Sequence, residues 1–283
     1  MKNNNIQMVA SDLDGTLLNR HADLSQQTID VLIRLQESGI KLVLCTGRPL
    51  HSAQRFIDVL RLKEFDGAFI GLNGQYLHDF ATNTTIEEEQ LTNDDISTIF
   101  DIASSVGIFS MEVYDKGSVY LLFPQRSPLL SLGVSLAYGI RSLIHQSRNY
   151  KIKIIKSLPQ GQTTAKVCFL GKPKNLKQIN ELIEKHPAYG SFLVNRAWLE
   201  VMKNDINKGK TLEKLAILHS ISLEHIMAFG DGENDCSMMK IVGTSFATKN
   251  AMDHTKNLAD EVIDYHYNDA VAKKCLEYFD LDQ

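Results

Sequence analysis

Short apolar runs alternate with segments of helical spacing near both ends of the chain, and this alternation most limits the folds open to it. Near the start, apolar runs at residues 6–11, 41–45 and 68–72 are separated by two helix candidates. The first has Ser25 as a candidate N-cap, and the second begins at Pro49. Continuous apolar runs joined by helices are typical of strands buried in a parallel sheet. The pattern therefore predicts an α/β core with a doubly wound, mostly parallel sheet.

The alternation stops in the middle of the chain and resumes towards its end. The intervening segment contains a hairpin candidate at residues 107–123 and an amphipathic helix candidate at residues 127–145. We therefore expect a core of residues 1–82 and 194–283, interrupted by an inserted α+β domain at residues 83–193. The length of 283 residues suits two ordinary domains, which agrees with this division.

Charge, hydropathy and cysteine content limit the partners and the cellular compartment that we expect for this chain. Lysine and arginine number 30 against 34 acidic residues, so a general nucleic-acid or anionic-membrane surface is not expected. No stretch is long and apolar enough to span a bilayer, and the N-terminal apolar run is too short for a signal peptide. The cysteines are dispersed, as is typical of a reducing compartment; they are Cys45, Cys168, Cys236 and Cys275. These features predict a cytoplasmic protein and leave its oligomeric state open.

Four polar motifs follow predicted strands or begin predicted helices, where ligands bind in open α/β sheets. The first, Asp12-Leu13-Asp14-Gly15-Thr16, places two carboxylates at the end of the first strand, and its glycine lets the backbone turn sharply. Asp12 is suited to act as a nucleophile or a metal ligand. A bare D-x-D is most often an acidic turn, but the five-residue form is much rarer by chance.

The second motif, Thr46-Gly47-Arg48, directly follows the second strand. A hydroxyl and neighbouring backbone N–H groups at a helix start form a site for an anion. Alone this signal is weak, because the same three residues often form an ordinary loop.

The third motif surrounds Lys208. The Gly-Lys-Thr at residues 209–211 resembles the end of a nucleotide-binding Walker A loop, but Asn204 stands where the first glycine is required. Lys208 is the better candidate, as a fixed cation opposite a phosphoryl group. The helix dipole disfavours a lysine at a helix start, and this unfavourable position supports a functional role over a solvated lysine.

The fourth motif, residues 230–235, follows a buried strand and contains Asp231, Asn234 and Asp235. Together with the first motif it brings four acids to one sheet edge, where they would repel one another unless they held a hard cation. Carboxylate, carbonyl and water oxygens are suited to Mg²⁺. The alternative is a solvated turn that caps a helix.

In this order the four motifs closely resemble the haloacid dehalogenase superfamily of phosphatases, over nearly all of the expected core. Further patterns resemble its Cof-type subfamily of sugar-phosphate and cofactor-phosphate phosphatases: Lys208-Gly209, Asn73-Gly74, Asn250-Ala251 and the Asn-Asp-Ala-Val-Ala of residues 268–272. That family inserts an α+β cap after the third core strand, where the alternation stops in this chain. The resemblance therefore implies a Rossmann-like core and a cap at residues 83–193 that governs substrate specificity.

The resemblance also implies the roles of individual residues. Asp12 would attack phosphorus and form an aspartyl-phosphate, while Asp14 would protonate the leaving alcohol and then activate water. Mg²⁺ would be bound by Asp12, the backbone carbonyl of Asp14 and Asp231, with Asp235 orienting a metal-bound water. The remaining site residues would contact the phosphate or the rest of the substrate: Thr46, Gly47, Arg48, Asn73, Lys208 and Asn234.

We therefore expect a Mg²⁺-dependent phosphatase that acts on a small phosphorylated metabolite. Side chains from residues 107–123 or 127–145 would touch the leaving group. Two alternatives stay open: a phosphotransferase or phosphomutase that passes the aspartyl-phosphate to another hydroxyl, and a receiver-like switch that keeps it without turnover. Receiver domains are much shorter and lack a cap, and the second carboxylate of Asp14 favours hydrolysis. The sequence does not identify the metabolite.

Overall fold

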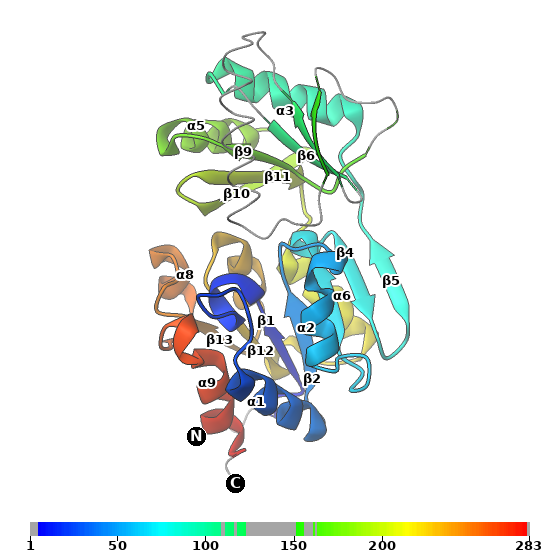
Figure 1. Cartoon of the computed structure of the whole chain (residues 1–283), viewed down its shortest axis with the longest axis vertical. Helices are drawn as coiled ribbons and strands as arrows, with labels where there is room; N and C mark the ends of the chain where they lie inside the picture. The colour runs from blue at the N-terminus through cyan, green and yellow to red at the C-terminus, as the bar shows by residue number, and fades with distance from the viewer. Residues whose placement is uncertain are drawn as a thin grey trace. The chain divides into compact units, whose positions relative to one another are not determined.

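The computed structural model describes residues 5–108, 111–115, 118–122, 151–155, 161 and 163–281. These residues form two compact units: the first contains residues 5–88 and 206–281, and the second lies between Glu89 and Asp205 (Figure 1). The helix expected at residues 127–145 lies outside the described residues.

The first unit is built on one eight-stranded sheet. Its strands are β1 (Met8–Ser11), β2 (Lys41–Cys45), β3 (Ala68–Gly71), β4 (Tyr76–Asp79), β5 (Thr84–Glu87), β12 (Ile226–Gly230), β13 (Thr244–Ala247) and β14 (Glu261–Val262). They lie in the order β14-β13-β12-β1-β2-β3-β4-β5. The six strands from β14 to β3 are parallel, and β4 and β5 add an antiparallel edge. The predicted doubly wound, mostly parallel sheet is confirmed.

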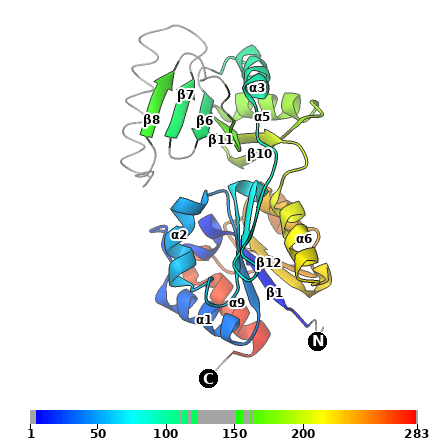
Figure 2. The same cartoon turned by 90° about the vertical axis from the view of Figure 1, so that its right-hand side faces the viewer.

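Helices cover both faces of this sheet (Figure 2). Alternate residues of β1 show why: Val9 packs in the apolar core on one face, and Met8 and Ala10 pack in the core on the other. The first core contains side chains from α1 (Gln26–Glu37), α2 (Leu50–Val59) and α9 (Ala270–Phe279); the second contains side chains from α6 (Lys208–Leu218) and α7 (Cys236–Met239). A short α8 (Asp253–Leu258) follows β13.

The order of the strands places a topological switch beside β1. From β1 the chain continues outwards through β2 and β3, whereas β12, β13 and β14 extend on the opposite side. Ligands bind at the carboxyl ends of strands at such a switch. The predicted motifs at Asp12, Thr46 and Asp231 directly follow β1, β2 and β12, so all three stand at this edge.

The second unit has a six-stranded sheet and two described helices. Its elements are α3 (Asn93–Ser105), β6 (Met111–Asp115), β7 (Ser118–Leu122), β8 (Lys151–Ile155), β9 (Val167–Leu170), α5 (Pro173–Ile183), β10 (Tyr189–Asn195) and β11 (Trp198–Lys203). The strand order is β10-β11-β9-β6-β7-β8, and only β7 and β8 run parallel. Side chains of α3 and α5 form one apolar core with β6, β9 and β11. The predicted α+β character and the hairpin within residues 107–123 are confirmed.

The boundaries between the units differ from the expected ones. β5 falls within the expected insert, residues 83–193, but it pairs with β4 in the first sheet. β11 falls within the expected core segment, residues 194–283, but it pairs with β9 and β10 in the second sheet. An apolar run does not show which sheet it joins, because its partners are distant in sequence. The observed divisions are at Glu88/Glu89 and Asp205/Ile206.

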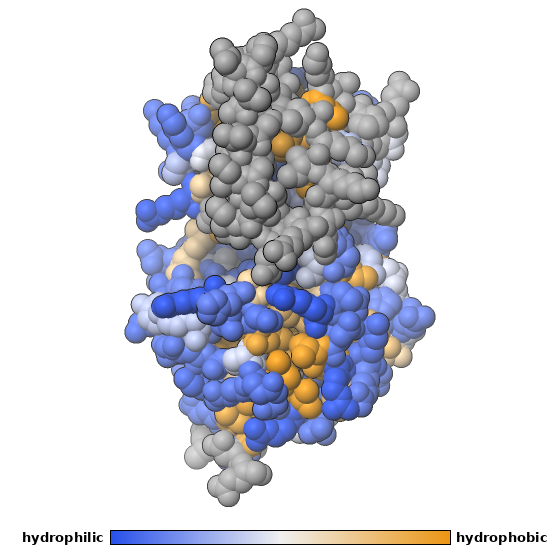
Figure 3. Space-filling view, in the orientation of Figure 1, coloured by the Kyte–Doolittle hydropathy of each residue, from blue (hydrophilic) through white to orange (hydrophobic). Residues whose placement is uncertain are grey.

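The surface of the described residues is mainly hydrophilic in the view of Figure 3, with a smaller hydrophobic area on the first unit. Within the described part of the chain, no helix has the length and apolar character needed to cross a membrane. All four cysteines are buried and carry free thiols.

Candidate active site

Asp12 ends β1 and begins the turn that carries the first motif. Its backbone is extended, and the chain then makes an irregular turn over Leu13–Leu17, in which Asp14 and Gly15 have non-helical dihedral angles. Gly15 allows this turn because its φ is +82°, and a Cβ there would lie 2.3 Å from Oδ2 of Asp231. Next to it, the hydroxyl of Thr16 donates to Oδ1 of Asp231 at 2.9 Å. Two motifs that are more than 200 residues apart in sequence therefore meet in the folded unit.

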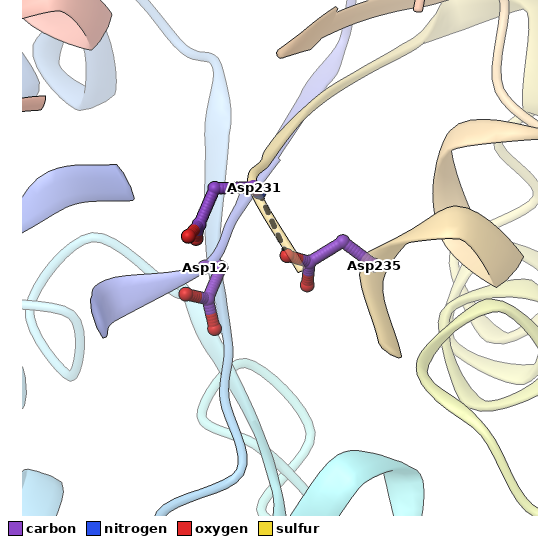
Figure 4. Close-up of side chains that lie close together, drawn as sticks. All are labelled: Asp12, Asp231 and Asp235. Carbon is purple, nitrogen blue, oxygen red and sulfur yellow. Dashed lines mark hydrogen bonds between the residues drawn. The ribbon is translucent and has the colours of Figure 1, made fainter. Parts of the chain in front are cut away.

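Three carboxylates gather at this point (Figure 4). One oxygen from each of Asp12, Asp231 and Asp235 lies within 4.8 Å of the other two. Oδ2 of Asp235 accepts hydrogen bonds from the backbone N–H groups of Asp231 and Gly232, both at 2.9 Å. The backbone of the loop thus fixes the orientation of Asp235 toward the other two acids.

Lys208 is the cation of this cluster. It is the first residue of α6 and is completely buried, and its Nζ donates to Oδ1 of Asp12 and Oδ1 of Asp235, both at 2.6 Å. Burial alone would lower the pKa of Lys208, but the two carboxylates hold that pKa above its ordinary value. Lys208 does not cap its own helix. The side chain of Asn207 caps the start of α6, because it accepts a hydrogen bond from the backbone N–H of Lys210 at 2.9 Å.

The charge of the cluster fits a hard divalent cation. Burial, followed by repulsion from Asp235 and Asp231, raises the pKa of Asp12 well above its ordinary value against the attraction of Lys208. Burial and then Asp235 raise the pKa of Asp231 to about 7. Three carboxylates and one ammonium leave two negative charges. Oδ2 of Asp12 and Oδ2 of Asp231 accept no hydrogen bond from the described residues, so each can take a further partner.

Asp14 and Arg48 pair with each other beside this cluster. The carboxyl of Asp14 is about half exposed and is not one of the three gathered carboxylates. Nε of Arg48 donates to Oδ2 of Asp14 at 2.6 Å, and Nη2 donates to Oδ1 at 2.5 Å. The expected acid is therefore held by both oxygens through a planar, two-pronged ion pair.

The other expected phosphate-side residues meet around Asn73. Its backbone lies in the left-handed region at φ +59°, and its N–H donates to the carbonyl of Thr46 at 3.1 Å. Nδ2 of Asn234 donates to Oδ1 of Asn73 at 3.0 Å, and a Cβ on Gly47 would lie 3.1 Å from the same oxygen. The structure thus joins the loops after β2, β3 and β12 through one buried asparagine.

Sequence reasoning assigned no role to several side chains that hold these loops. Thr211 of α6 donates to the carbonyl of Gly74 at 2.7 Å, and Thr248 and Asn250 both donate to the carbonyl of Gly15. Asn250 carried a signal only as part of the Asn-Ala pattern. Thr211 stood out only as the last residue of the broken Walker A resemblance. Thr248 carried no signal, because a hydroxyl near the end of an apolar run is common.

Known proteins resemble this chain over almost its full length. A family model described as haloacid dehalogenase-like hydrolase matches residues 9–274. The HMP-PP phosphatase of Escherichia coli O157:H7 is 31% identical over 249 residues, which cover 87% of this chain and 85% of that relative. The 5-amino-6-(5-phospho-D-ribitylamino)uracil phosphatase YitU of Bacillus subtilis is 24% identical over 281 residues, with 97% and 98% covered. The crystal structure of a haloacid dehalogenase-like hydrolase from Bacteroides thetaiotaomicron matches with a TM-score of 0.72 and 25% identity, over 97% of this chain and 100% of that one.

Proposed function

Because the chain belongs to the haloacid dehalogenase-like hydrolases and is a phosphoric monoester hydrolase, we propose that it uses Mg²⁺ and an aspartyl-phosphate on Asp12. The observation that carries this proposal is the position of Asp12 at the end of β1. One of its carboxylate oxygens accepts a hydrogen bond from Lys208. An oxygen of Asp12 also lies within 4.8 Å of carboxylate oxygens of Asp231 and Asp235.

Asp12 has the geometry of a nucleophile. Its Oδ2, which accepts no hydrogen bond from the described residues, would attack phosphorus in line with the leaving alcohol. The new bond joins this oxygen to phosphorus as the bond from phosphorus to the alcohol oxygen breaks. The ammonium of Lys208 would attract the oxygens of the phosphoryl group, where negative charge gathers during transfer.

Asp14 would move the protons in both steps. In the first step its carboxyl gives a proton to the departing alcohol oxygen. In the second step its carboxylate takes a proton from the water that attacks phosphorus, which releases inorganic phosphate and restores the carboxylate of Asp12. Arg48 holds both oxygens of Asp14, which suits the carboxylate form of this group. Asp14 would carry its proton only after Arg48, a substrate-side group in this proposal, releases one of these oxygens.

Mg²⁺ would be held by Asp12, Asp231 and the backbone carbonyl of Asp14, with Asp235 orienting a bound water. When bound, the ion supplies positive charge that offsets the repulsion between a carboxylate and a phosphate dianion. The two backbone donors to Asp235 would keep its carboxylate in place for that task. Thr46, Gly47, Asn73 and Asn234 would complete the phosphate side with a hydroxyl, backbone N–H groups and amides.

The proposed substrate is a small phosphorylated metabolite. Two relatives are named for their substrates, HMP-PP and a phosphoribitylaminouracil, and both are small phosphorylated compounds. In this proposal the second unit is the cap that selects the leaving group. A cytoplasmic location belongs to the proposal as well, because four buried free thiols suit a reducing compartment.

The test is hydrolysis of p-nitrophenyl phosphate by the purified chain, with Mg²⁺ and with a chelator. We expect activity with Mg²⁺, loss of activity with chelator, and loss in Asp12→Asn. Brief incubation with a radiolabelled phosphomonoester followed by acid quenching should label the wild type and not Asp12→Asn. Asp101→Asn, an exposed acid of α3, is the matched control and should retain full activity. Activity that survives both the chelator and Asp12→Asn would refute the mechanism.

A further inference from the structure

The carbonyl of Gly15 receives two side-chain hydrogen bonds from one distant loop. Oγ1 of Thr248 donates to this oxygen at 3.1 Å, and Nδ2 of Asn250 donates to it at 2.8 Å. Thr248 is completely buried and directly follows β13. Two donors on one carbonyl use both of its lone pairs, so the peptide after Gly15 is held in a single orientation.

Asn250 extends this contact to a third segment. While its Nδ2 donates to Gly15, its Oδ1 accepts from the backbone N–H of His266 at 3.1 Å. His266 also contacts the residue that follows the turn at Leu13–Leu17, because its Nδ1 is 2.5 Å from the carbonyl of Leu18. The turn after Asp12 is thus anchored at Gly15 and Leu18 to residues that follow β13 and β14.

The same loop also holds the other side of the carboxylate cluster. The N–H of Thr248 donates to the carbonyl of Gly230 at 3.2 Å, and the N–H of Met252 donates to the carbonyl of Asp231 at 3.0 Å. Residues 248–252 therefore bind both the turn that carries Asp14 and the residue Asp231.

We propose that Thr248 and Asn250 are positioning residues that keep the turn at Asp14 and Gly15 in register with Asp231. The inference rests on the proposed function, because the backbone carbonyl of Asp14 and the carboxylate of Asp231 are the proposed Mg²⁺ ligands. Gly15 links these two ligands: it follows Asp14, and its Cα lies against the carboxylate of Asp231. Release of its carbonyl would let the ligands separate without removing either of them.

Because both side chains bind the same oxygen, each should compensate in part for loss of the other. We expect Thr248→Val and Asn250→Ala each to weaken Mg²⁺ binding about 3-fold, the usual effect of one hydrogen bond. The double variant should weaken it by about 30-fold, more than the product of the two single effects. Isothermal titration of the metal-free protein with MgCl₂, without substrate, measures these constants directly.

Three further measurements separate positioning from general damage to the fold. Thr248→Ser keeps the hydroxyl and should bind Mg²⁺ like the wild type. Thr28→Val removes a comparable buried hydroxyl, which bonds to Asp269, and should leave Mg²⁺ binding unchanged. In the double variant at saturating Mg²⁺, kcat should recover most of its loss while KM for p-nitrophenyl phosphate stays within about twofold.

The possible results are distinguishable. Mg²⁺ binding by the double variant within about twofold of the wild type would overturn the inference. Equal weakening in Thr28→Val would also overturn it, because the effect would then reflect stability alone. A wild type with no Mg²⁺-dependent phosphatase activity would instead refute the proposed function, whatever the variants bind.

Discussion

Replacement of Lys208 by methionine tests most directly whether the buried ammonium compensates the charge of the carboxylate cluster. Methionine keeps an unbranched side chain of similar length but removes the ammonium. In the folded chain that ammonium is completely buried and donates to Asp12 and Asp235 at 2.6 Å each. The variant would leave the cluster of Asp12, Asp231 and Asp235 without its buried cation, so the buried carboxylates of Asp12 and Asp235 would lose the charge that compensates them.

The expected loss of stability follows from this burial. Removal of one partner from a buried ion pair costs about 3–5 kcal/mol, because the other charge is left uncompensated. Two hydrogen bonds to charged groups, at about 1.5–3 kcal/mol each, give a similar figure. The carboxylates can relieve part of the cost by taking up a proton, so we expect about 3 kcal/mol, the lower end of the range.

The assay is urea unfolding of the metal-free protein at pH 8, where ordinary carboxyls are ionised, followed by circular dichroism. Lys210→Met is the matched control: this lysine lies two residues further along α6 and is exposed, so its loss should change stability by less than about 0.5 kcal/mol. A loss below about 1 kcal/mol in Lys208→Met would refute the reasoning, since a buried, doubly bonded ammonium could not then be compensating the cluster.

Three other changes test separate parts of the first unit. Asp231→Asn removes one of three mutually repelling acids, so the metal-free variant should unfold at a higher temperature than the wild type. Added MgCl₂ should no longer raise the midpoint temperature of unfolding. Thermal scans with and without Mg²⁺ check both results. Gly15→Ala forces a side chain into a left-handed backbone and to 2.3 Å from the carboxylate of Asp231, so kcat/KM should fall by more than about 100-fold with secondary structure retained by circular dichroism. For Asp79 burial alone would raise the pKa, but hydrogen bonds from Thr82 and Lys41 lower it from its ordinary 3.8 to about 2. This group therefore adds stability above pH 4 that is lost as the pH falls toward 2, about 1–2 kcal/mol after allowance for solvent screening, and urea midpoints measured across this window should show the loss in the wild type and not in Asp79→Asn.

The sequence allowed prediction that the candidate site residues lie together, because parallel strands bring their carboxyl ends to one edge of the sheet. Asp12, Thr46 and Asp231 each follow an apolar run, and those runs became β1, β2 and β12 in neighbouring positions of one sheet. The pairing of Asp14 with Arg48 was not predictable, since nothing in either motif shows which group its side chain will face. The same limit explains Thr248 and Asn250, whose partner is a carbonyl more than 200 residues away.

The domain boundaries were missed for a related physical reason. In β11 Trp198, Leu199 and Val201 are buried, and that composition equally suits a strand of the first sheet. The pairing of β11 with β9 shows which sheet it joins: Leu199 lies opposite Phe169, and Glu200 lies opposite Cys168. Side chains of this strand alternate between the apolar core of α3 and α5 and a buried ion pair of Glu200 with Lys166 at 2.8 Å. A buried charge needs a specific partner, and only the three-dimensional pairing supplies one.

The arrangement of charges also bears on how the first unit folds. Asp12 comes from the segment before the second unit in sequence, whereas Lys208 and Asp235 come from the segment after it. A buried carboxylate without its cation is disfavoured, so docking of α6 should stabilise the strand that ends at Asp12 in its native position. Lys208 can pair with Asp235 within the later segment, but its second carboxylate partner, Asp12, is present only when β1 is in place. Assembly of this charge cluster and closure of the sheet between β1 and β12 should therefore be coupled.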